Sequence, residues 1–283
     1  MFASPRRLDL KLYCTPQRSV NSKTLDIWPA SPIIIYAEKT KSKEDVTNVI
    51  SALRHHNRVC KIYYRLYSSW QHRHSSLLKE FAAIDEPFPA LTSLVIVSFI
   101  QQDVTPLPDS FLSGSAPRLR SLDLVGMPYP SIGTLLSSTT NLVRLSLWRI
   151  FLIPDISHPE AIVPCLSTLP RLKSLRLGFQ HLRSRVHQAS RRPPPFIRIV
   201  FPKLTSLHFR GDMEYLDDTL SQIETPILNR SDFGLFNQLV FDTPLLGHFI
   251  RRTETFMTIH RARVEFLSWA VLCLTFGTRR YGQ

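Results

Sequence analysis

A short apolar pattern recurs along the chain and limits what it can fold into. The pattern has the form L-x-x-L-x-L, and most copies have a proline two residues before the first leucine. Five strong copies begin at Leu91, Leu119, Leu142, Leu172 and Leu204, and weaker copies begin at Val59 and Leu228. Successive copies start 32, 28, 23, 30, 32 and 24 residues apart. Self-similarity at such a period indicates a repeat architecture.

The spacing within each copy predicts the structure of one unit. The last two apolar residues lie two apart, so they point to the same face of a short strand. One unit cannot bury its apolar side alone, so neighbouring units must stack. Segments with helical spacing separate the copies, at 42–57, 75–86, 131–139, 158–169, 213–225 and 243–253. We therefore predict an α/β fold, a leucine-rich-repeat-like solenoid (horseshoe) with parallel strands on the concave face and helices on the convex face.

The repeat divides the chain into three parts. We expect an N-terminal repeat or capping region at 1–56, an irregular repeat array at 57–265 and a divergent C-terminal tail at 266–283. A basic, proline-rich stretch at 180–196 interrupts the array. We expect it to be an extended, solvated loop, with a nuclear signal or a proline-motif ligand as alternatives.

The net charge and the cysteine spacing limit the expected partners and cellular compartment of the protein. The formal net charge of +13 favours anionic partners without choosing among nucleic acid, membrane surfaces, acidic proteins and phosphopeptides. The four cysteines include no C-x-x-C pair, which fits reduced thiols in an intracellular protein. The most apolar run, 266–276, is too short to span a bilayer, and the N-terminus lacks the apolar core of a signal peptide. We expect a cytoplasmic or nuclear protein that does not enter a membrane.

Motifs of catalysis are missing from the sequence. It contains no G-x-x-x-x-G-K-[ST], G-x-G-x-x-G, G-x-S-x-G or H-E-x-x-H. His72 and His74 could face the same side of a strand as a metal pair, but no third ligand accompanies them. We therefore expect no enzyme, and we assign no catalytic residue, cofactor or metal site.

The strand positions between the core leucines predict a binding surface. If the leucines point inward, these alternate residues point into the hollow of the arc. We predict that a partner binds there through Arg144, Trp148, Arg176, His208, Arg210 and Asp123. Trp and Arg dominate binding energies at protein interfaces, and guanidinium groups suit carboxylates or phosphates. The partner we expect is a protein, acidic or phosphorylated; the alternative is that these are ordinary solvated strand residues.

Several short sequence segments outside the repeat core resemble those of one known family. They lie at 10–28, 57–60, 108–119, 191–195 and 236–244. These segments are similar to those of the F-box, leucine-rich-repeat-like proteins of basidiomycete fungi, and the resemblance extends over roughly residues 8–266. The resemblance implies an N-terminal F-box that docks on the adaptor of a cullin–RING ubiquitin ligase, and repeats that select the substrate. No F-box opening is recognised in this sequence, so the resemblance covers only the substrate-reading part. Binding of the ligase adaptor is expected only if an F-box exists outside this chain.

These observations favour a non-catalytic protein–protein interaction module. It resembles the substrate-recognition region of an F-box (SCF-type) ubiquitin ligase subunit. One alternative is a basic nucleic-acid-binding repeat protein, although no nucleic-acid-binding motif is seen. Another is a truncated product without activity.

Overall fold

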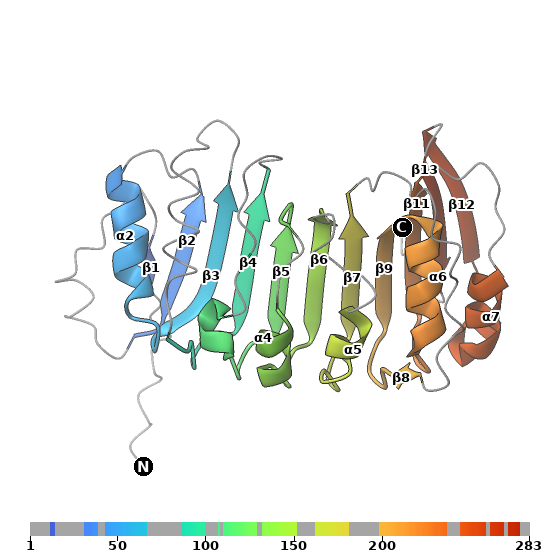
Figure 1. Ribbon diagram of the computed structural model, residues 1–283, viewed down its shortest axis with the longest axis horizontal. Helices are drawn as coiled ribbons and strands as arrows, with labels where there is room; N and C mark the ends of the chain where they lie inside the picture. Colours follow the sequence, from blue (N-terminus) through green and yellow to red (C-terminus); the bar gives the residue numbers. More distant parts are fainter. Residues whose placement is uncertain are drawn as a thin grey trace, which may run out of the picture.

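The computed structural model describes residues 12–14, 31–38, 43–66, 86–99, 107, 110–128, 132–151, 162–180, 198–236, 244–258, 261–268 and 271–277. Within these ranges the strands form one eleven-stranded sheet and one small two-stranded sheet. Few helices accompany them. The protein is therefore α/β, with a large and mostly parallel sheet (Figure 1).

The strands of the large sheet follow the order of the chain almost throughout. The order is β1-β2-β3-β4-β5-β6-β7-β9-β11-β13-β12. The parallel part comprises β1 (Leu12–Cys14), β2 (Ile33–Glu38), β3 (Val59–Leu66), β4 (Ser93–Ser98), β5 (Ser121–Val125), β6 (Arg144–Ile150), β7 (Ser174–Phe179), β9 (Ser206–Gly211) and β11 (Arg230–Phe236). Two antiparallel strands, β13 (Val271–Gly277) and β12 (Arg261–Ser268), complete it.

The repeated apolar pattern explains the strands and their register. Each strong copy yields a strand that begins two residues after its first leucine. The second core positions lie opposite one another across neighbouring strands, in the row Ile62, Leu94, Leu122, Leu145, Leu175, Leu207 and Ser231. The third positions form a second row, Tyr64, Ile96, Leu124, Leu147, Leu177, Phe209 and Phe233. Both rows are buried, and each large apolar side chain contributes about 1.5–3 kcal/mol.

The first leucine of each strong copy turns the chain into its strand. Its backbone N–H donates to the carbonyl three residues earlier, at Leu91, Leu119, Leu142, Leu172 and Leu204. The next residue then donates to the preceding unit, as Arg120 N–H does to the Thr92 carbonyl and Val143 N–H does to the Arg120 carbonyl. Units are therefore hydrogen-bonded to one another before the regular strand pairing begins.

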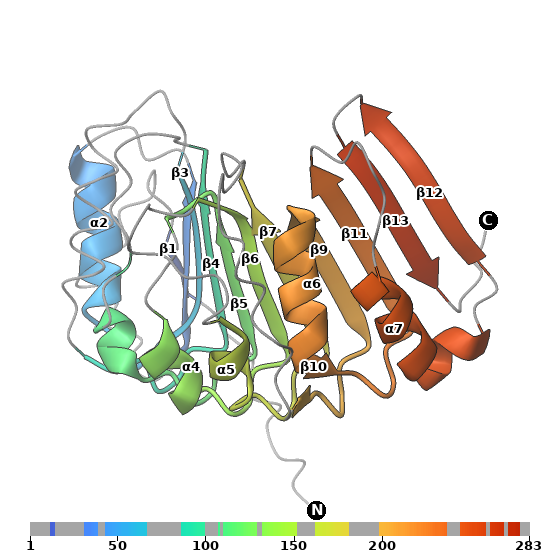
Figure 2. The same ribbon diagram turned by 45° about the vertical axis from the view of Figure 1, so that its right-hand side comes forward.

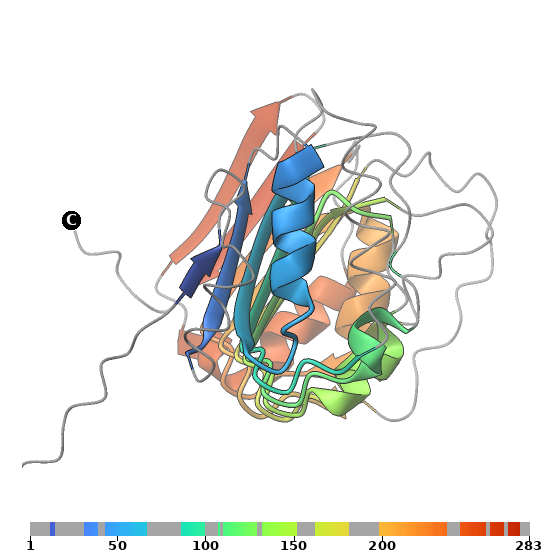
Figure 3. The same cartoon turned by 90° about the vertical axis from the view of Figure 1, so that its left-hand side faces the viewer.

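The described helices cover one face of the large sheet (Figures 2 and 3). They are α2 (Lys43–Leu53), η2 (Phe111–Gly114), α4 (Gly133–Ser138), α5 (Ile162–Leu166), α6 (Met213–Gln222), α7 (Pro244–Arg252) and η4 (Glu254–Thr258). Five of the six segments predicted as helical contain a helix, usually a shorter one; the segment 75–86 lies almost wholly outside the described residues. Buried residues such as Leu136, Leu216 and Phe249 join these helices to the core. The small sheet pairs β8 (Ile199–Val200) with β10 (Ile223–Glu224) in parallel.

The expected domain boundaries do not interrupt the large sheet. Strand β2 pairs with β3, so the sheet continues across the expected boundary at residue 56. The boundary at residue 266 falls inside β12, and β13 pairs with both β11 and β12. Leu272 and Leu274 of β13 are buried in the core. Part of the expected tail is thus built into the fold, whereas the loop 180–196 lies outside the described residues except for Gln180.

No helix in the described part of the chain is both long enough and apolar enough to cross a lipid bilayer.

Candidate functional site

The face of the large sheet opposite the described helices carries the residues that alternate with the core, and we call it the open face (Figure 3). Side chains along a strand point alternately to its two sides, so the core rows fix which residues lie on this face. The strand register then sorts them into rows that cross the sheet. Each row takes one residue from each successive strand.

The first row of the open face contains only hydroxyl and cationic side chains. We call it the serine–arginine row, and it consists of Lys61, Ser93, Ser121, Arg144, Ser174, Ser206 and Arg230. Lys61, Arg144 and Arg230 are exposed. No carboxylate occurs in the row over these seven strands.

The second row is chemically mixed. From β3 to β11 it contains Tyr63, Val95, Asp123, Ser146, Arg176, His208 and Asp232. Arg176 therefore stands between two carboxylates, Asp123 on one side and Asp232 on the other. Burial lowers the pKa of Arg176, and the two carboxylates oppose this shift because they favour the charged guanidinium.

All six residues predicted to bind a partner lie on the open face, and two of them stack on each other. The Arg176 guanidinium carbon lies 3.6 Å from the centre of the Trp148 ring, a cation–π contact. Gly178 makes room for this indole, because a Cβ there would lie 2.4 Å from Trp148 Cε3. The guanidinium is thus held against the indole face.

His208 and Arg210 contact their own neighbours on β9 and β11. Ser206 Oγ lies 2.9 Å from His208 Nε2, and His208 Nδ1 lies 3.6 Å from Asp232 Oδ2. The interaction with His208 lowers the pKa of Asp232, while partial burial acts in the opposite direction. The Arg210 guanidinium lies 5.2 Å from the centre of the Phe236 ring.

Asp123 and Arg144 occupy different surroundings from the other four. Burial raises the pKa of Asp123, and the nearby Ser146 hydroxyl and Arg176 guanidinium offset part of that rise. Asp123 Oδ1 and Ser146 Oγ are both buried on adjacent strands, and the Ser146 hydroxyl is the donor beside this carboxylate. Arg144 is exposed and lies in the serine–arginine row, away from the Trp148 stack.

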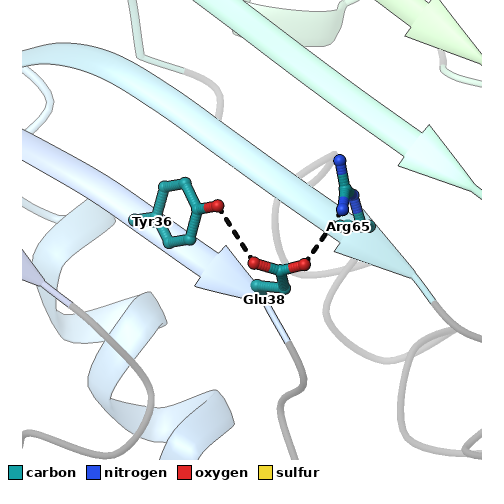
Figure 4. A network of polar contacts seen from close by, with 3 residues as sticks. All are labelled: Tyr36, Glu38 and Arg65. Atoms are coloured by element: carbon teal, nitrogen blue, oxygen red, sulfur yellow. Dashed lines mark hydrogen bonds and ion pairs between the residues drawn. The ribbon is translucent and has the colours of Figure 1, made fainter.

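A second cluster at the N-terminal end of the open face was missed by the sequence analysis (Figure 4). Tyr36 Oη donates to Glu38 Oε2 at 3.0 Å, and Arg65 Nη1 donates to Glu38 Oε1 at 3.0 Å. The hydrogen bond to Glu38 raises the pKa of Tyr36. Tyr36 also stacks on Tyr63, with ring centroids 4.6 Å apart and planes 5° from parallel. The available signal was the apolar run at 33–35, which predicts a strand but lacks the L-x-x-L-x-L form.

Within the described ranges, no three His, Cys, Asp or Glu side chains gather in a way that could hold a metal ion. The pair His72 and His74 lies outside those ranges. Comparison of the chain with protein-family models, with curated proteins and with solved structures finds no match. The fold is that of an α/β protein whose large, mostly parallel sheet displays aromatic, cationic, hydroxyl and carboxylate side chains on the open face.

Proposed function

We propose that the protein is a leucine-rich-repeat-like solenoid that binds a protein partner on the open face, which would be the concave side of a horseshoe. One observation supports this most: parallel strands in chain order display Trp, Tyr and Arg on the face opposite the described helices. These residue types contribute most of the binding energy at protein interfaces. Stacking of Arg176 on Trp148 reduces the conformational entropy that binding would otherwise cost.

The role we propose is non-catalytic, and the family resemblance suggests its setting. In the F-box proteins that the sequence resembles, the repeats are expected to select the substrate of a ubiquitin ligase, so we propose the same task for this chain. Binding of the ligase adaptor would require an F-box outside it. Cys165 and Cys273 form no disulfide, which is consistent with action in the cytoplasm or nucleus.

Nucleic acid is the second candidate, because of the net charge of +13 and the serine–arginine row. It predicts affinity that falls steeply with salt, since phosphate contacts release counterions. Glu38, Asp123 and Asp232 on the same face weigh against it, because each would repel a phosphate backbone.

The proposal is tested by co-purification with a paired charge reversal. In one variant Arg144 and Arg176, both on the open face, are changed to Glu. In the control variant Arg118 and Arg251 are changed to Glu, which alters the net charge equally at exposed sites off this face. We expect the wild type and the control to recover the same specific protein, and the open-face variant to lose it. Equal recovery by all three proteins, or recovery of nucleic acid alone, would reject the proposal.

A further inference from the structure

We infer that the open face binds an extended peptide bearing an oxyanion side chain, phosphoryl or carboxylate, and that Arg144 with Ser121 and Ser174 receives the oxyanion. The inference rests on the proposed function and adds the chemistry of the partner. It depends on the serine–arginine row and on the Asp123 carboxylate beside it.

The three residues form a continuous set of donors. Ser121 pairs with Arg144 across β5 and β6, and Arg144 pairs with Ser174 across β6 and β7. Adjacent strands lie about 4.8 Å apart, so the set spans about 10 Å. A guanidinium presents a planar fork of N–H donors that matches carboxylate and phosphate oxygens, and hydroxyls rotate to suit.

Arg144, rather than Arg176, is the cation available to an incoming anion. Arg144 is exposed, and its row contains no carboxylate over seven strands. Arg176 lies between Asp123 and Asp232 and has its face against Trp148. The charge of Arg176 is therefore compensated within the protein, whereas that of Arg144 is left for a ligand.

Asp123 favours a peptide over a nucleic acid as the carrier of the oxyanion. Its side chain is half-buried on the open face, and a carboxylate there accepts hydrogen bonds from the N–H groups of a peptide. Asp123 lies one strand across and two residues along from Arg144, about 8 Å away by ordinary strand geometry. In an extended peptide, an N–H two residues from the anionic side chain lies at a comparable separation. A phosphate backbone would instead place more negative charge beside Asp123.

The probes are three degenerate peptide libraries that differ only at a central residue, which is phosphoserine, glutamate or serine. Each is immobilised and exposed to the full chain. We expect at least about tenfold greater retention on an anionic library than on the serine library. Arg144→Ala should abolish this preference, Ser121→Ala and Ser174→Ala should each reduce it, and Arg118→Ala should leave it unchanged. A stronger phosphoserine signal identifies a phosphoryl ligand, and a glutamate signal at least as strong identifies a carboxylate.

Equal retention on all three libraries would overturn the inference. Release of the chain from the immobilised peptide by an equimolar single-stranded oligonucleotide carrying the same charge would also overturn the inference, because that result would assign the serine–arginine row to nucleic acid. The proposed function is tested separately. If a co-purified protein is still lost on reversal of Arg144 and Arg176 while the chain is retained equally on all three libraries, the open face binds protein but not through an oxyanion.

Discussion

The ionised carboxylate of Asp123, which is partly buried on the open face, lowers the free energy of unfolding. Burial removes one oxygen of this carboxylate from water and raises the pKa of the group, and the Ser146 hydroxyl offsets only part of that rise. When a pKa is raised on folding, the associated stability is fully present below the unfolded value and is lost as the pH rises through the folded value. The ionised form of Asp123 therefore lowers the stability of the protein at neutral pH.

The first prediction follows from this sign. Asp123→Asn keeps a carbonyl acceptor and removes the charge. We therefore expect the free energy of unfolding of the variant to be larger than that of the wild type at neutral pH. The difference should shrink as the pH falls through the raised pKa and vanish below about pH 3.9, the ordinary value for Asp. Urea unfolding over a pH series measures it. A variant less stable than the wild type at neutral pH would contradict this account.

At the scale of elements, two glycines occupy opposite environments. Gly126 follows β5 with a φ of +65°, and a Cβ there would lie 2.0 Å from the Ser98 carbonyl oxygen. Gly247 lies inside α7, with nothing within 4 Å of its would-be Cβ. The first glycine is required by the close approach of two neighbouring units. The second only weakens a helix.

The same substitution should therefore change stability in opposite directions. We expect Gly126→Ala to destabilise the protein by at least about 1–2 kcal/mol, since the left-handed conformation alone costs that much in an L-residue. Gly247→Ala should stabilise it by about 0.5–1 kcal/mol. Thermal or urea unfolding of the two variants provides the comparison. Destabilisation by both changes would show that the environment of Gly247 is not as described.

The strands of the repeat were predictable, and the strands at the two ends of the large sheet were not. Copies beginning at Leu91 or Leu172 fix both the strand and its register, because a slip of one residue would turn every leucine to the opposite face. Strand β2 pairs with β3 through a register shift after Ile33, which no pattern in the sequence encodes. The contacts of Tyr36 with Glu38 and Tyr63 depend on that pairing.

The site was predictable as a face but not as a set of contacts. Alternation along each strand placed Arg144, Arg176 and Trp148 on one side of the sheet. Which of these side chains contact one another depends on the directions that they take across neighbouring strands. Arg149, in the left-handed region at φ +54°, accompanies a register shift after Leu147, so the end of β6 departs from the regular repeat. The stacking of Arg176 on Trp148 could therefore be recognised only in the three-dimensional structure.

At the scale of the whole molecule, the C-terminal hairpin completes the sheet. Strand β13 covers the edge of β11, and β12 becomes the outermost strand. Phe276 of β13 contacts Phe233 of β11 and Phe256 of η4, with ring centroids 6.3 and 6.1 Å apart. The outer strand carries an ion pair between Arg263 and Glu265, and charged side chains on an edge strand oppose unwanted pairing with other chains.

The hairpin gives the next prediction. Leu274 is buried, so Leu274→Ala should cost about 2–4 kcal/mol through lost transfer free energy and a cavity. Thr275, the next residue, lies on the open face, and Thr275→Ala should change stability by no more than about 0.5 kcal/mol. Denaturant unfolding distinguishes the two. Equal, small effects would show that the hairpin is not part of the cooperative fold.

The alternation of core and surface along the strands is the claim on which the fold, the site and both proposals depend. It is tested most directly by placing single cysteines at residues 144, 145, 147 and 148 of β6, in a chain whose own cysteines have been replaced by serine. The rate of thiol labelling is then measured at each position. We predict rapid labelling at positions 144 and 148 and strong protection at 145 and 147. Uniform labelling, or protection at 144 and 148 with labelling at 145 and 147, would contradict the account.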